Sequence, residues 1–160
     1  MLDSKKQEEY LQLSSYIEKF ATLNIKSSSN GLAPHKPVLL VSVIRLIDSG
    51  VIATNRIWPD DIIKDEFESN WRRYVPEDCV FKPWVWKPYW HLKTEGFWHF
   101  ETIDSDCDAE TIVPAGQTAS IGKIRECIRF AYLDEALFDL LQYDANRQVL
   151  SRVLIETYLL

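Results

Sequence analysis

The sequence contains little cysteine and no long apolar run. Its three cysteines, Cys79, Cys107 and Cys127, are an odd number without paired spacing, which is typical of reduced thiols rather than of a disulfide framework. No stretch is long enough to span a bilayer. The charged N-terminus, MLDSKKQEEY, lacks the apolar region of a secretory signal. These absences together predict a cytoplasmic protein that does not enter a membrane.

The motifs of several enzyme classes are also missing. There is no Walker motif, no dinucleotide-binding fingerprint and no serine nucleophile elbow. The metal-binding spacings C-x-x-C and H-x-x-x-H are absent. The acidic residues at 104–108 lack the glycine and the distal glutamate of a calcium-binding loop. We therefore expect this chain to carry no catalytic site, no metal and no cofactor.

Charge of one sign is in excess. The chain has 24 acidic and 18 basic side chains and a net charge of −6. This excess argues against indiscriminate binding of nucleic acid over the whole surface. It does not exclude a local basic patch, so the distribution of charge along the chain is more informative than its sum.

A chain of 160 residues is long enough for one domain with a substantial core. Residues 35–50 predict the central helix, because Pro37 suits a first turn, Gly50 suits a left-handed cap, and the residues between are mostly apolar on several faces. Further elements are expected as helices at 4–21, 60–74, 121–130, 134–142 and 144–160, a strand at 56–58, and a β-hairpin at 88–100. The sequence thus predicts an α+β fold, a predominantly helical single domain with a small antiparallel β-sheet or hairpin.

One segment, residues 71–93, combines cations with aromatic rings. Its bases are Arg72, Arg73, Lys82, Lys87 and Lys93. Its rings are Trp71, Tyr74, Phe81, Trp84, Trp86, Tyr89 and Trp90. Cations contact phosphates while flat rings contact bases or sugars, so the segment is a candidate DNA-binding surface. The alternative is that the tryptophans belong to the core and the bases to an ordinary surface.

The start of the central helix is a second candidate site. His35 and Lys36 stand at a helix N-terminus, whose free N–H groups and dipole favour an anion such as a phosphate. His35 is equally compatible with a cap or a packed ring. His91 and His99 fit half-buried strand positions or, with a cysteine or an aspartate, a small metal-dependent hydrolase. A further alternative is a protein-interaction or oligomerisation module whose exposed tryptophans contact a partner.

Two motifs, APHKPVLL at 33–40 and PYWHLKTEGFWHF at 88–100, resemble a known family. They are similar to the DNA-binding domain that precedes the HNH nuclease in modification-dependent, type IV restriction enzymes. The characterised members are sulfur-binding domains that recognise phosphorothioate-modified DNA. The resemblance covers most of the chain, including residues 133–160. It implies that residues 1–160 are one recognition domain that binds phosphorothioate-modified double-stranded DNA. This domain is either the specificity domain of a longer nuclease, with a downstream nuclease domain as partner, or a stand-alone reader.

The resemblance also implies a site. In that family the sulfur lies in a shallow apolar pocket where the helix tip meets the proline-aromatic loop. The matching positions here are His35, Lys36, Pro88, Tyr89 and His91. Sulfur is larger, more polarisable and less strongly hydrated than oxygen, so an apolar wall favours it. The chain departs from the family at Lys87, where the sulfur-reading members carry a tyrosine, and Trp86 and Tyr89 are the candidates for the missing ring.

Overall fold

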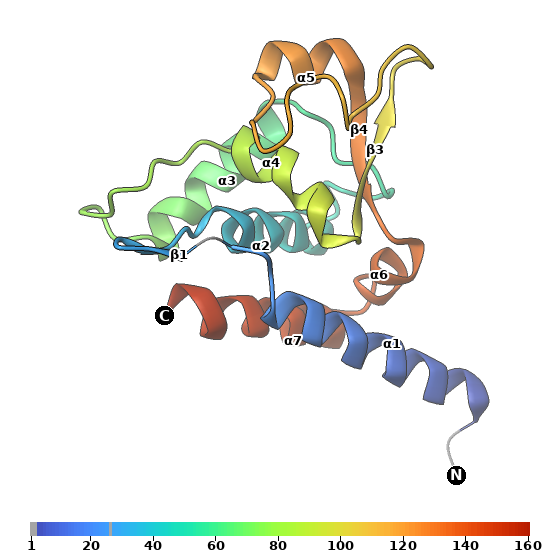
Figure 1. Cartoon of the computed structure of the whole chain (residues 1–160). Coiled ribbons are helices and arrows are strands. Elements are labelled where there is room, and N and C mark those ends of the chain that lie inside the picture. The colour runs from blue at the N-terminus through green and yellow to red at the C-terminus, as the bar shows by residue number, and fades with distance from the viewer. Residues whose placement is uncertain (1–2, 26) are drawn as a thin grey trace.

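The computed structural model describes residues 3–25 and 27–160 (Figure 1). The helices are α1 (Ser4–Ala21), α2 (His35–Asp48), α3 (Asp61–Tyr74), α4 (Trp86–His91), α5 (Ile121–Cys127), α6 (Glu135–Leu140) and α7 (Asp144–Leu154). A 3₁₀ helix (Leu92–Glu95) follows α4, and a π-helical stretch (Ile155–Leu159) follows α7. Antiparallel pairs form between β1 (Ser27–Ser28) and β2 (Gly31–Leu32) and between β3 (Trp98–Thr102) and β4 (Ile128–Leu133). The prediction of a mostly helical α+β fold is confirmed.

Helix α2 lies at the centre of the core, as the sequence predicted. All of its residues except Arg45 and Asp48 are buried, and both α3 and α7 pack against it. Gly50 has a φ of +80° and its N–H donates to the Ile47 carbonyl at 3.1 Å. This left-handed residue ends the helical stretch and turns the chain away.

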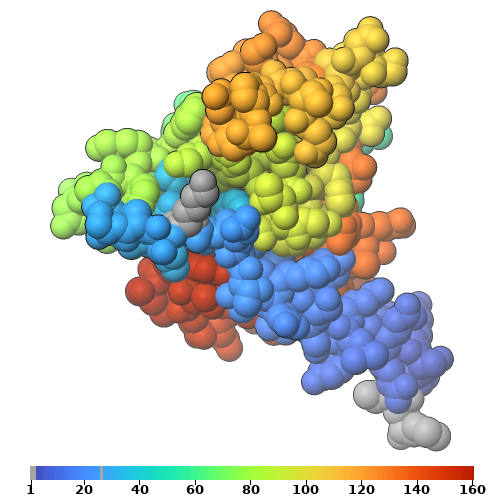
Figure 2. All heavy atoms as spheres, in the orientation of Figure 1, coloured from blue at the N-terminus to red at the C-terminus, as the bar shows by residue number. Residues whose placement is uncertain are grey.

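Helix α1 has the predicted bounds, and its C-terminal half supplies its buried residues. The Asp3 carboxylate accepts from the Lys6 N–H at 2.8 Å and caps the helix. Tyr16 and Phe20 are buried in the core. Tyr10 and Leu11 are each 67% exposed, because the N-terminal half of α1 projects beyond the body of the molecule (Figures 1 and 2).

The predicted hairpin at 88–100 is wrong. Its first half is helix α4 and a 3₁₀ helix, and only β3 is extended. Pro88 is tolerated in α4 because it lies in the first turn, where its missing N–H breaks no helical bond. Strand β3 pairs instead with β4, Trp98 opposite Leu133. The alternating rings that suggested a hairpin are buried on several sides by tertiary packing, which local periodicity does not encode.

The remaining differences concern where elements end. The helix expected at 121–130 stops at Cys127, and the chain continues as β4. The strand expected at 56–58 is a single bridge between Ile57 and Ala131. The two final helices are shorter than expected, with the last one changing to π-helical geometry after Leu154. No described helix is both long enough and apolar enough to cross a membrane.

Candidate nucleic-acid interface

His35 ties the tip of α2 to the loop at residues 76–85. Its Nε2–H donates to the Lys82 carbonyl at 2.7 Å, and its ring packs against Trp71 with centroids 4.8 Å apart. The pKa of His35 is lowered to about 4, chiefly by burial; the hydrogen bond to the Lys82 carbonyl opposes this lowering, and the charge of Lys87 adds to it. The ring is therefore neutral at pH 7. It is the packed histidine of the alternative interpretation and offers no charge to a phosphate.

Lys36 is a buried cation whose charge is already compensated. Its Nζ lies 2.7 Å from the Glu95 Oε1 and donates to the Asn24 carbonyl at 2.7 Å. Only about a tenth of its side chain is exposed. The same Glu95 oxygen accepts from the Asn24 N–H at 2.9 Å. In this structure the ammonium holds α2 to the end of the 3₁₀ helix.

Tyr89 is also an interior residue. Its side chain is completely buried, and its hydroxyl donates to the Ile57 carbonyl at 2.7 Å and accepts from the Ala131 N–H at 3.1 Å. Burial raises the pKa of Tyr89, so the hydroxyl stays protonated. Trp86 and Pro88 are buried beside it. The rings of Trp86 and Tyr89 therefore both lie in the interior of the protein.

Two of the predicted phosphate-binding cations lie at the two ends of one irregular turn. Lys82 and Lys87 are exposed, and between them Trp84 is 47% exposed. The Trp84 N–H donates to the Lys82 carbonyl at 2.8 Å, and the Lys87 N–H donates to the Trp84 carbonyl at 3.4 Å. We call residues 82–87 the Lys–Trp turn. It follows the part of the loop that forms the left edge of the molecule in Figure 2.

Two further predicted bases lie on the helix before this loop. Arg72 and Arg73 occupy the last turn of α3 and are exposed. Across the described chain, Lys82, Lys87, Arg72 and Arg73 form no ion pair with a carboxylate. Their positive charge is therefore available to an anionic ligand. Trp84 belonged to the aromatic set in the sequence, but nothing there separated it from the buried Trp86 two residues later.

His91 and Lys93 lie at the other end of α4 and face different partners. The Nε2 of His91 is 2.7 Å from the Thr118 hydroxyl. The Lys93 Nζ lies over the Trp90 ring at 4.6 Å and 3.8 Å from a Glu110 carboxylate oxygen. His91, the last residue of α4, and Lys93, in the 3₁₀ helix, thus both contact the segment between β3 and α5.

The arrangement required for a metal-dependent hydrolase is not formed. His99 bonds Asp134 at 2.6 Å, whereas His91 bonds Thr118. Within residues 3–25 and 27–160, no group of three or more histidine, cysteine, aspartate or glutamate side chains is suited to hold a metal. Four of the six tryptophans, Trp71, Trp86, Trp90 and Trp98, are buried, which agrees with the interpretation of most rings as core residues.

Comparisons with known proteins find similarity at the level of structure. No protein-family model matches the chain, and no curated protein matches it. The sulfur-binding domain of ScoMcrA, solved in complex with phosphorothioated DNA, matches with 20% identity and a TM-score of 0.65 over 89% of this chain and 86% of that one. The corresponding domain of SprMcrA, also with phosphorothioated DNA, matches with 18% identity and a TM-score of 0.66 over 91% and 85%.

A larger ScoMcrA structure extends the comparison. It contains the sulfur-binding domain and an SRA domain, complexed with phosphorothioated DNA. It matches with 22% identity and a TM-score of 0.64 over 90% of this chain and 42% of that one. The chain therefore has the fold of these sulfur-binding domains.

Proposed function

We propose that this chain is a DNA-binding domain that recognises phosphorothioate-modified duplexes and directs a type IV restriction nuclease to them. The observation that carries the proposal is the group of uncompensated cations around an exposed tryptophan in the Lys–Trp turn. It occurs on a fold shared with domains solved on phosphorothioated DNA. We further propose that residues 1–160 act as one recognition domain, in the cytoplasm, with the nuclease supplied by another domain.

In the Lys–Trp turn, cations bind the phosphates and an exposed aromatic ring binds the sulfur. Lys82 and Lys87 neutralise the phosphodiester, and Arg72 and Arg73 extend the positive surface to neighbouring phosphates. Trp84 supplies the exposed ring that Trp86 and Tyr89 do not, and its face contacts the sulfur. A polarisable sulfur gains more from that face than a well-hydrated oxygen does.

The buried residues of the expected site, His35, Lys36 and Pro88, support the Lys–Trp turn from the interior of the protein. His35 holds the Lys82 carbonyl, and Lys36 holds α2 against Glu95. Pro88 lies buried in the first turn of α4, directly after Lys87. Their substitution should therefore alter DNA binding through the stability and shape of the turn.

The test measures duplex affinity as a function of salt. The double variant Lys82→Ala/Lys87→Ala should weaken binding to modified and plain duplexes alike. It should also reduce the slope of log affinity against log salt by about 1.8, or about 0.9 for each phosphate that the protein no longer neutralises. The control is Lys5→Ala/Lys6→Ala on α1, which removes the same charge from a helix distant in the fold and should leave the slope unchanged. Equal slopes for wild type and both double variants would contradict the proposal.

A second variant separates the sulfur contact from the phosphate contacts. Trp84→Ala should lower the ratio of affinities for modified over plain duplex and leave the salt slope as it is. An unchanged ratio would remove Trp84 from the sulfur site. Failure of the wild-type protein to bind any duplex would instead favour the protein-interaction alternative, for which the exposed Trp58 and Trp84 provide apolar surface.

A further inference from the structure

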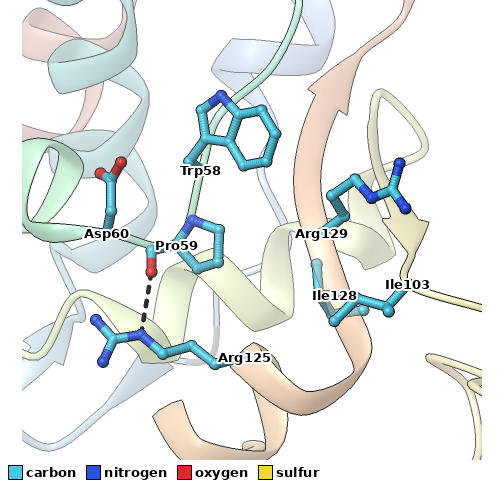
Figure 3. Close-up of a pocket in the computed structure, with 7 residues that line it drawn as sticks. All are labelled: Trp58, Pro59, Asp60, Ile103, Arg125, Ile128 and Arg129. Atoms are coloured by element: carbon cyan, nitrogen blue, oxygen red, sulfur yellow. Dashed lines mark hydrogen bonds between the residues drawn. The ribbon is translucent and has the colours of Figure 1, made fainter.

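A cavity of about 420 Å³ lies between the segment before α3 and the start of β4 (Figure 3). Its lining combines Trp58 with Ile103 and Ile128, and adds two arginines, Arg125 from α5 and Arg129 from β4. The size falls within the range of pockets that hold small ligands or parts of larger ones. None of these residues belongs to the Lys–Trp turn.

The two guanidinium groups of the cavity carry uncompensated charge. Arg125 donates through its Nε to the Pro59 carbonyl at 3.3 Å, and Figure 3 shows the guanidinium groups of Arg125 and Arg129 on opposite sides of the pocket, pointing away from each other. Within the described chain, neither arginine forms an ion pair. The one carboxylate in the lining, Asp60, caps α3 by accepting from the Ile62 N–H at 3.0 Å. The cavity therefore favours an anion.

The rest of the lining favours a flat or apolar group next to that anion. Trp58 is 43% exposed and meets Phe130 edge-on, with ring centroids 5.1 Å apart. Ile103 is 41% exposed. Outside the lining, the Arg56 guanidinium lies 5.1 Å from the centroid of the same Phe130 ring. Cations combined with exposed aromatic faces are the features with which proteins bind nucleic-acid strands.

Helix α4 connects this cavity to the Lys–Trp turn. The Tyr89 hydroxyl bonds the backbone of Ile57 and Ala131, which directly precede Trp58 and follow Phe130. Lys87 lies two residues before Tyr89, and α4, with six residues, is about 9 Å long. A single DNA molecule is large enough to contact both places.

We infer that this cavity is a second DNA contact, which takes one nucleotide of a strand. Because their guanidinium groups point away from each other, Arg125 and Arg129 contact the phosphates on either side of that nucleotide, and the sugar or base lies against Trp58. The inference rests on the proposed function, since it assumes that the chain binds DNA. Because the cavity is separate from the sulfur site, it adds affinity without distinguishing sulfur from oxygen.

The test uses the whole chain and matched duplexes with and without a phosphorothioate. Arg125→Ala/Arg129→Ala should weaken binding to both duplexes about tenfold at low salt and reduce the salt slope by about 1.8 for two phosphates. The ratio of affinities for the two duplexes should stay unchanged. Arg125→Lys/Arg129→Lys keeps the charge and should retain most of the slope, while Trp58→Ala should lower affinity at an unchanged slope.

Each outcome has a defined consequence. If the wild type binds DNA and the arginine double variant matches Lys5→Ala/Lys6→Ala in affinity and slope, the second contact is overturned and the proposed function stands. If the arginine variant changes the ratio of the two duplexes, the separation of the two sites is overturned. If the wild type binds neither duplex, the proposed function and this inference fail together. Both arginines and Trp58 are exposed, and circular dichroism checks that each variant is folded.

Discussion

His35 determines how the loop at residues 76–85 is attached to the core. Its hydrogen bond to the Lys82 carbonyl requires a proton on Nε2, because a carbonyl only accepts. Nδ1 is buried and finds no hydrogen-bond partner among the described residues. A proton added to that nitrogen would create a buried charge close to Lys87. The attachment of the loop is therefore sensitive to acid.

This sensitivity gives a pH prediction. The pKa of His35 is about 4 in the folded chain and about 6.5 when unfolded, so the unfolded state binds the proton more readily between these values. The stabilisation is present above about pH 6.5 and is lost as the pH falls toward 4. We expect wild type to lose about 2 kcal/mol more unfolding free energy than His35→Gln between pH 7 and pH 5, in urea titrations. His91 and His99 are common to both proteins, so an identical pH dependence would contradict the assignment.

The ion pair between Lys36 and Glu95 gives a second residue-scale prediction. Glu95→Ala leaves a buried ammonium without its carboxylate and should cost about 3–5 kcal/mol in denaturant unfolding. The matched control is Glu68→Ala, which breaks the more exposed pair that Glu68 forms with Lys64 at 3.1 Å and should cost less than about 1 kcal/mol. Equal losses of unfolding free energy in the two variants would show that the buried Lys36–Glu95 pair stabilises the fold no more than the exposed Lys64–Glu68 pair.

At the scale of elements, the sequence predicted what depends on local chemistry. Helix α2 was predictable because its mostly apolar residues lie between Pro37 and Gly50. Proline favours the first turn of a helix, and glycine favours the left-handed position after its end. Helix α4 was not, because its rings are buried through contacts made by distant residues. The Tyr89 hydroxyl, for example, bridges Ile57 and Ala131. No local pattern contains that contact.

Gly50 allows an element-scale prediction. Its φ of +80° lies where a side chain is strained, so Gly50→Ala should lower the unfolding free energy by about 1–2 kcal/mol. Gly122 lies in α5 with ordinary helical geometry, and a Cβ added there would meet only the Ser120 Oγ at 3.8 Å. Gly122→Ala should therefore be neutral or stabilising. Thermal melts of the two variants check the contrast, and similar losses for both would contradict it.

The same difference between local patterns and contacts of distant residues explains which candidate site residues could be predicted from the sequence. Lys82 and Lys87 stood out because they form a local excess of positive charge in an acidic chain. The role of Lys36 was hidden because its partner, Glu95, lies far along the sequence. The cavity around Trp58 and Arg125 was missed because its residues are spread over three separate segments and make no local cluster.

At the scale of the whole molecule, a net charge of −6 coexists with two positive regions connected by α4. If the chain binds DNA as we propose, the acidic remainder of the surface repels DNA and restricts binding to these regions. Phosphate contacts then supply affinity that falls with salt, whereas an apolar contact to sulfur depends little on salt. Recognition of the modification should therefore persist where overall affinity is weak.

A competition assay tests this central claim most directly. Labelled phosphorothioate duplex is bound to the protein and displaced with unlabelled duplexes of identical sequence, one modified and one plain, at low and at high salt. We expect the modified duplex to be the stronger competitor at both salt concentrations, by a similar factor. Equal competition by the two duplexes at both concentrations would contradict recognition of the sulfur and leave a DNA-binding domain with a different target.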